Sequence, residues 1–139
     1  MPDTLKVAFA TDDHVAVNQH FGSARGFAIY AVDAARASLV EVAGFGEAAM
    51  DGNEDKLAAR IDALDGCAAV YCLAVGGSAV RQLLAAGVQP VRMDDEEAIK
   101  PLLIRLSAAI REGGVPWIDR HTRKDIGRFE RMASQKWQE

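Results

Sequence analysis

The sequence predicts an α/β fold, in which a mixed five-stranded sheet lies between layers of helices. Apolar residues alternate over several short segments, which is typical of strands. Elsewhere they recur every three or four residues, as in helices, and these helical segments alternate with further strand-like ones. The chain has 139 residues and is 50% hydrophobic, which suits a single domain with one core.

Three strands are expected in the first part of the chain, over residues 5–10, 26–32 and 38–42. The first has Leu5, Val7 and Phe9 on one face and small residues on the other. The second and third are joined by a connection short enough for a hairpin, so we expect them to be antiparallel neighbours.

The period becomes helical after residue 53, where apolar residues fall at positions i, i+4 and i+7: Leu57, Ile61 and Leu64. Gly66 is expected to end this helix. Residues 67–75 then form an apolar run without alternation, which is typical of a strand that is covered on both faces. We expect this strand at the centre of the sheet.

The remaining elements are helix, strand and helix. The first helix begins at the turn 76–78, ends at Gly87, and has an apolar face made of Val80, Leu83 and Leu84. Residues 88–93 form a strand that Pro90 places at an edge of the sheet. The last helix starts between residues 97 and 100 and carries four apolar residues before 113–114: Leu102, Leu103, Leu106 and Ile110.

This order of elements resembles a ribonuclease H-like three-layer α/β/α topology, with an antiparallel meander followed by two right-handed crossovers.

The distribution of charged residues divides the chain into two parts. Residues 1–112 carry 10 basic and 16 acidic groups, whereas residues 113–139 carry 6 basic and 4 acidic groups. The first part is thus net negative and the second net positive, so we expect a folded domain over 1–112 and a basic C-terminal tail over 113–139.

Composition argues against several classes of function. A net charge of −4 leaves no surplus of positive charge for nucleic-acid binding. No apolar run approaches the roughly 18 residues of a membrane helix and no signal segment opens the chain, so a cytoplasmic location is expected. Cys67 and Cys72 are expected to be reduced and, being five residues apart, to point to opposite faces of a strand.

The first candidate site is the loop over residues 11–25, which contains His14 and His20. Function is often carried by such loops, and a neutral imidazole binds iron, zinc or copper. Beside His20, Phe21 would supply an apolar wall, and the backbone at Gly22 would allow a ligand to approach closely. The alternative is that His20 only caps a turn. His14 is the weaker candidate.

The second candidate site is the segment over 76–81, a glycine turn where a buried strand leads into a helix. Free backbone amides and the positive end of the helix dipole favour an anion there, and Arg81 would lie near the mouth. Tight turn geometry alone also explains these glycines. The sequence lacks the glycine patterns of phosphate-binding loops.

Two further sets of side chains were weighed. Cys72 lies near the carboxyl end of its strand, where α/β sheets bind ligands, although a small buried core residue is the simpler interpretation. Asp12 and Asp13 follow the first strand and would suit a two-metal nuclease only if further carboxylates, such as Glu41 or Asp55, converged on them.

Taken together, five segments resemble the dinitrogenase iron-molybdenum cofactor-binding family over about residues 5–112. They are KVAFA (6–10), HFGSA (20–24), FAIY (27–30), DGNEDKLAA (51–59) and the stretch from CAAVYC (67–72) to SAVRQLL (78–84). The joint occurrence of these segments in this order is specific, although each one alone is not.

The resemblance implies a ribonuclease H-like fold without enzymatic activity. Members of the family bind the iron–sulfur precursor cluster made by NifB, as well as the finished iron-molybdenum cofactor, and hold or pass them toward the NifEN scaffold during nitrogenase assembly. The histidine of the His-Phe-Gly motif, here His20, is the residue tied to cofactor binding.

The chemistry of such clusters suits the candidate residues. An anionic, sulfide-rich cluster is held by a replaceable ligand, by amides that donate to sulfur and by nearby cations. His20, the backbone around Gly22 and Ser23, and the side chains of Arg25 and Arg81 would supply these groups. Two alternatives remain, a module that docks proteins without binding metal and a ribonuclease H-like nuclease.

Overall fold

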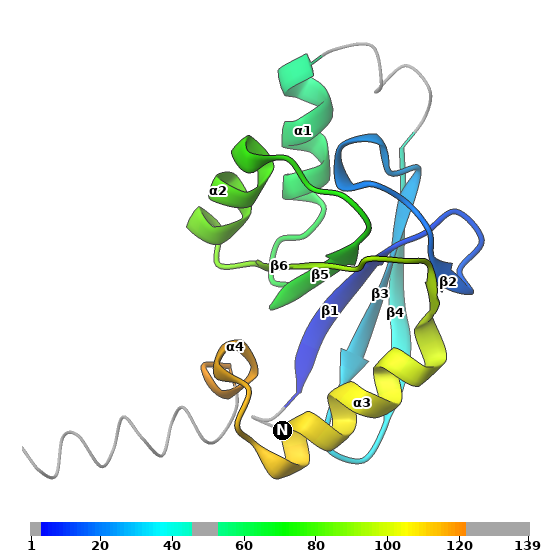
Figure 1. The fold of residues 1–139 in the computed structure, drawn as a ribbon, viewed down its shortest axis with the longest axis vertical. Helices are drawn as coiled ribbons and strands as arrows, with labels where there is room; N and C mark the ends of the chain where they lie inside the picture. The colour runs from blue at the N-terminus through cyan, green and yellow to red at the C-terminus, as the bar shows by residue number, and fades with distance from the viewer. Residues whose placement is uncertain (1–3, 46–52, 122–139) are drawn as a thin grey trace, which may run out of the picture.

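The computed structural model describes residues 4–45 and 53–121. The elements follow the chain as β1 (Leu5–Ala10), β2 (Ala16–Val17), a 3-10 helix η1 (Phe21–Ser23), β3 (Gly26–Val32), β4 (Ala37–Gly44), α1 (Asn53–Asp62), β5 (Ala69–Cys72), α2 (Gly77–Ala85), β6 (Gln89–Arg92), β7 (Glu97–Ala98), α3 (Ile99–Glu112) and α4 (Pro116–Asp119). Figure 1 shows their arrangement.

The main sheet has five strands in the order β4-β3-β1-β5-β6. Strand β3 is antiparallel to both of its neighbours, whereas β1, β5 and β6 are parallel to one another. The mixed five-stranded sheet and the α/β class are therefore confirmed. Strands β2 and β7 form a separate two-stranded ribbon.

Each face of the main sheet has its own apolar core. Val7 and Phe9 of β1 point toward α3 and α4, with Leu102 and Ile118 among their neighbours. On the other face, Ala8, Ala10 and β5 pack with α1, α2 and η1. The helices thus lie on both faces of the sheet and give three layers (Figure 1).

Several expectations from the sequence are confirmed. The bounds of β1 and β3 are those predicted, and β3 and β4 form the antiparallel pair. Gly87 follows the C-cap of α2 with a φ of +82°, the left-handed conformation with which glycine commonly ends helices. Helix α1 instead ends at Asp62, and Gly66, with a φ of +85°, ends the turn that follows it. Strand β6, which contains Pro90, lies at an edge of the sheet.

Three expectations about the sheet and its faces are wrong. Strand β1 rather than β5 is central, because β5 and β6 lie on one side of β1 and the hairpin lies on the other. Leu84 of α2 is 52% exposed, whereas Leu83 faces the core as expected, together with Ala79. Cys67 precedes β5 and packs in the same cluster as Cys72, so strand alternation does not separate the two thiols.

The polypeptide continues as ordered structure beyond residue 112. Ile118 of α4 is only 2% exposed and packs in the α3-side core, where Val115 and Trp117 also contribute. This part of the expected 113–139 tail therefore covers the sheet. The rest of the tail, residues 122–139, lies outside the described residues.

Within the part of the chain that the structure describes, every helix is too short or too polar to cross a lipid bilayer.

Candidate functional site

The loop that follows β1 is shaped by the carboxylate of Asp13. Its Oδ1 accepts hydrogen bonds from the backbone N–H of Val15 (2.8 Å) and Ala16 (3.1 Å) and from the hydroxyl of Thr11 (3.0 Å). The bonds from Val15 and Ala16 are the main reason that the pKa of Asp13 lies below its ordinary value. His14 has a φ of +62° within this turn. Asp13 therefore stabilises the loop.

The segment around His20 is fastened to the chain just beyond β5. The N–H of Leu73 donates to the carbonyl of Gln19 (2.9 Å), and the N–H of Phe21 donates to the carbonyl of Ala74 (2.8 Å). These two backbone bonds join segments that are more than fifty residues apart in the sequence. They place His20 beside the turn that leads into α2.

The His20 imidazole makes a third link to the same turn. Its Nδ1 accepts a hydrogen bond from the N–H of Ala74 at 3.2 Å. His20 precedes η1, but its side chain makes no capping bond there; the turn amide that it accepts belongs to the segment after β5. Because Nδ1 is the acceptor, the proton of the neutral ring is on Nε2. The ring itself is exposed.

Phe21 and Arg60 hold the loop from beneath. The Phe21 ring is fully buried and stacks on Phe27, with 5.7 Å between the ring centroids. Arg60 is also fully buried, and its guanidinium donates to the carbonyl of Ala24 through Nε (3.1 Å) and Nη2 (2.5 Å). The same guanidinium lies 4.5 Å from the centre of the Phe45 ring. Phe21 is thus an anchor, not the cavity wall that the sequence suggested.

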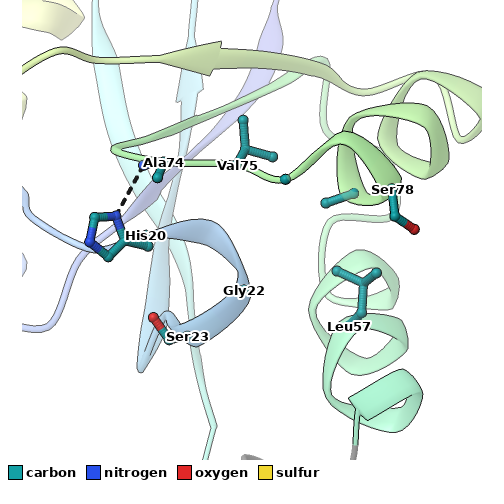
Figure 2. A pocket seen from close by; sticks show the side chains of 9 residues that line it. His20, Gly22, Ser23, Leu57, Ala74, Val75 and Ser78 are labelled. Atoms are coloured by element: carbon teal, nitrogen blue, oxygen red, sulfur yellow. Dashed lines mark hydrogen bonds between the residues drawn. The ribbon is translucent and has the colours of Figure 1, made fainter.

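A cavity of about 470 Å³ opens beside His20. Its lining comes from η1 and its flank, from α1, from the turn before α2 and from the first turn of α2: His20, Gly22, Ser23, Leu57, Ala74, Val75, Gly76, Ser78 and Ala79. Figure 2 shows His20, Gly22 and Ser23 on one side, with Leu57 and Ser78 on the other. The structure therefore joins the two candidate sites, which the sequence analysis treated separately, into one.

The N-terminus of α2 opens into this cavity. The first amides of an α-helix have no carbonyl partners within the helix, and residues 76, 78 and 79 all line the cavity. The first bond of this helix runs from the N–H of Val80 to the carbonyl of Gly76. This end of α2 can therefore donate hydrogen bonds to an anion that lies near His20.

The other predicted site residues lie outside the lining. Arg25 and Arg81 are exposed, and a Cβ atom added at Gly77 would lie 3.6 Å from Nη1 of Arg81. Arg81 thus folds back toward the first turn of α2. Cys72 is fully buried, and burial raises the pKa of its thiol to about 11. It does not reach the cavity in this conformation.

Three lining residues were not singled out by the sequence analysis as site residues, namely Leu57, Ala74 and Val75. Leu57 follows the helical apolar period and was assigned to the core. Ala74 and Val75 were assigned to a strand that in fact ends at Cys72. None of these side chains carries a chemical signature, so the sequence offered no signal for them.

A two-metal nuclease would need several carboxylates close together. Over residues 4–45 and 53–121, the structure contains no group of three or more His, Cys, Asp or Glu side chains able to hold a metal ion. Asp12 pairs instead with Asn18, whose Nδ2 lies 2.9 Å from its Oδ1.

Comparisons with known proteins match nearly the whole chain. A family model described as dinitrogenase iron-molybdenum cofactor matches residues 3–109. Protein NifX of Azotobacter vinelandii is 52% identical over 139 residues, which cover 97% of this chain and 88% of that protein. FeMo cofactor biosynthesis protein NifB of Bradyrhizobium diazoefficiens is 28% identical over 96% of this chain but only 26% of its own length.

The fold is also found in a solved structure. The crystal structure of PH0822 aligns with a TM-score of 0.60 and 20% sequence identity, covering 78% of this chain and all of that one. At this identity the likeness concerns the fold alone, whereas the family model and the similarity to NifX establish the family. The chain belongs to the dinitrogenase iron-molybdenum cofactor family, as its His-Phe-Gly and neighbouring motifs predicted.

Proposed function

We propose that this protein binds the iron–sulfur precursor cluster of the iron-molybdenum cofactor as cargo, in the cavity between His20 and the N-terminus of α2. Family membership assigns the chain to iron-molybdenum cofactor biosynthesis and nitrogen fixation. The observation that supports the finer proposal is that an exposed imidazole and the open amides of α2 line the same cavity.

His20 is the proposed ligand to iron. Among the described lining residues it is the only one whose side chain carries a nitrogen or sulfur donor for iron. Its Nδ1 accepts the Ala74 amide, so ligation through Nδ1 requires the ring to leave that amide. The freed N–H of Ala74 then becomes a donor for a cluster sulfide. This exchange of one bond for another suits a carrier that must release its cargo.

Groups around the cavity would compensate the negative charge of the cluster. The amides of the first turn of α2 and the backbone at Gly22 and Ser23 are the proposed donors to sulfide. A Cβ atom at Gly22 would have no neighbour within 4 Å, so packing within the chain does not require glycine there. Arg25 and Arg81 are proposed as flanking cations, while Phe21 fixes the loop from below.

We place this cargo step in the cytoplasm between NifB, which makes the cluster, and the NifEN scaffold, with the finished cofactor as a second possible cargo. Strand order supports the ribonuclease H-like label for the fold. Counting only the strands of the main sheet along the chain, their order is 3-2-1-4-5, with the second antiparallel.

The test is an anaerobic titration of the metal-free protein with the isolated precursor cluster, followed by gel filtration and iron analysis. We expect iron to comigrate with the protein, and His20→Ala to weaken binding by more than about tenfold, since a ligand is lost. His14→Ala is the matched control, because its ring lies on the same loop but does not line the cavity. Equal comigration for His20→Ala and wild type would exclude His20 as the ligand.

A further inference from the structure

Several of the exposed apolar side chains belong to two elements, β4 and α3. Among the described residues, six large hydrophobic side chains are prominently exposed, and four of them belong to β4 or α3: Leu39, Val40, Val42 and Ile104. Ile104 is the most exposed of all, at 71%. The remaining two, Val15 and Leu84, belong to other elements. Exposed apolar patches mark interaction sites on soluble proteins, so we ask which of these side chains lie on the same side of the sheet.

Strand pairing shows on which side of the sheet the patch lies. Leu39 is paired with Tyr30, which packs in the α3-side core, and Val42 is paired with Ala28 on the same side. Helix α3 packs against β3, the neighbour of β4. A helix is about 10 Å wide and covers roughly two strands. Over residues 4–45 and 53–121, no helix therefore covers this side of β4.

A cavity of about 500 Å³ lies between α3 and the β3–β4 connection. Its apolar lining includes Tyr30, Leu103 and Ile104, and its basic lining is made of Arg36, Lys100 and Arg111. We call this cavity the basic groove.

Three cations surround an apolar floor in the basic groove, although the whole chain has a net charge of −4. Arg111 is held in place, because its Nη1 donates to the carbonyl of Ala34 at 2.6 Å. The neighbouring carboxylate of Asp33 accepts the N–H groups of Ala35 and Arg36, so it is engaged by the backbone of the connection. The local charge is therefore opposite in sign to that of the molecule as a whole.

We propose that the basic groove and the adjoining side of β4 bind an acidic amphipathic helix of a partner protein. Such a helix, lying beside α3, would cover Leu39 and Val42 and complete the helical layer. Its carboxylates would pair with the groove cations, which set orientation and association rate. A second copy of this chain fits less well, because the same three cations would face one another.

Docking at this groove leaves the His20 cavity open. The β3–β4 connection lies at the end of the sheet where Leu5 is paired with Val32, whereas the His20 loop follows Ala10, which is paired with Phe27 at the other end. Figure 1 shows the connection beside α3, at the far end of the sheet from the loop after β1. The proposal is independent of the cluster, so it can be tested on the metal-free protein.

The probe is a fluorescent synthetic helix of about 18 residues, long enough to be helical in water, with leucine along one face and glutamate along both flanks. Fluorescence polarisation of this peptide with the full metal-free chain measures binding. We expect saturable binding that weakens roughly tenfold or more when glutamine replaces every glutamate, and that also weakens as salt is raised. Hydrogen exchange should show protection in β4 and α3.

Two variants and one control locate the site. Ile104→Glu and the double variant Arg36→Glu with Lys100→Glu should each reduce affinity by at least about tenfold, since one places charge in the apolar floor and the other reverses the groove. Leu84→Glu is the control: it alters another exposed apolar side chain, on α2 (52% exposed), and should have no effect. Thermal unfolding of each variant confirms that it is folded.

Three results would overturn the proposal. Equal binding to the Ile104→Glu and Leu84→Glu variants would mean that the groove is not the site. Equal binding of the glutamine peptide would exclude an acidic partner. Self-association of the wild-type chain in sedimentation, abolished by Ile104→Glu, would assign the surface to a second copy of the chain.

Discussion

The N–H of Ala74 donates a hydrogen bond to Nδ1 of His20, 54 residues earlier in the chain, at 3.2 Å. The backbone bonds of Leu73 and Phe21 flank this contact on either side. The imidazole is therefore held by the turn that leads into α2, and its orientation depends on a backbone group that no motif in the sequence identifies.

The first prediction concerns exchange of the Ala74 amide with solvent. In His20→Ala the amide loses its acceptor, so its hydrogen exchange should become roughly tenfold faster. The amides of Leu73 and Phe21, which donate to carbonyls, should keep their protection. Amide exchange followed by NMR makes the measurement, with His14→Ala as the control. Loss of protection at all three amides would mean that the ring itself orders the loop.

The second prediction concerns charge at the N-terminus of α2. Ser78→Asp places a carboxylate beside the open amides, where it stabilises the helix but repels an anionic cargo. We therefore expect an unchanged or higher melting temperature together with cluster binding that is weaker by about tenfold. Ser38→Asp, on exposed β4, is the matched control. If Ser78→Asp binds the cluster as well as wild type does, the amides at the N-terminus of α2 do not contact the cargo.

The third prediction concerns the buried Arg60. In Arg60→Met the apolar side chain keeps most of the volume but leaves the Ala24 carbonyl without its guanidinium donors, so the free energy of unfolding should fall by about 2 kcal/mol. Urea denaturation measures the loss. Arg92→Met, at an exposed arginine 3.9 Å from Asp94, should change stability by less than about 0.5 kcal/mol. Equal stability of the two variants would mean that the hydrogen bonds from Arg60 to the Ala24 carbonyl do not stabilise the fold.

The fourth prediction concerns stability in alkaline solution. Burial raises the pKa values of Cys67 and Cys72 to about 11, and that of Tyr71 to about 12. The unfolded chain therefore loses these protons at lower pH than the folded one, and stability should fall as pH rises from 9 toward 12. Calorimetry across this range makes the measurement. Replacing both cysteines with alanine should reduce the fall between pH 9 and 11, and an unchanged pH dependence would contradict the assignment to the thiols.

Much of the fold could be predicted because its strands and helices follow clear apolar periods. The bounds of β1 and β3 are correct for this reason. Strands β2 and β7 have only two residues each, which is too short for any period to be visible. The centre of the sheet was assigned to the wrong strand because β1 has small residues on one face, a pattern typical of a strand that is partly exposed. In the structure Ala8 and Ala10, which are on that face, are fully buried.

The candidate site could be predicted only in pieces. The residue types at His20 and at 76–78 have recognisable chemistry, but their meeting in one cavity depends on the pairing of Gln19 and Phe21 with residues 73–74. Backbone hydrogen bonds of this kind are available to any residue except proline as donor, so sequence patterns do not encode them. The buried Arg60 was missed because arginine is rarely fully buried.

The backbone pairing around position 20 also bears on how this protein could evolve. Since main-chain atoms hold the loop there and Phe21 anchors it from below, the side chain at position 20 can change without remodelling the support. A single substitution to methionine would present a thioether donor at the same place, a soft ligand that suits copper(I). The geometry of the cavity is thus distributed over several elements, whereas the donor atom that it would offer to a metal depends on residue 20 alone.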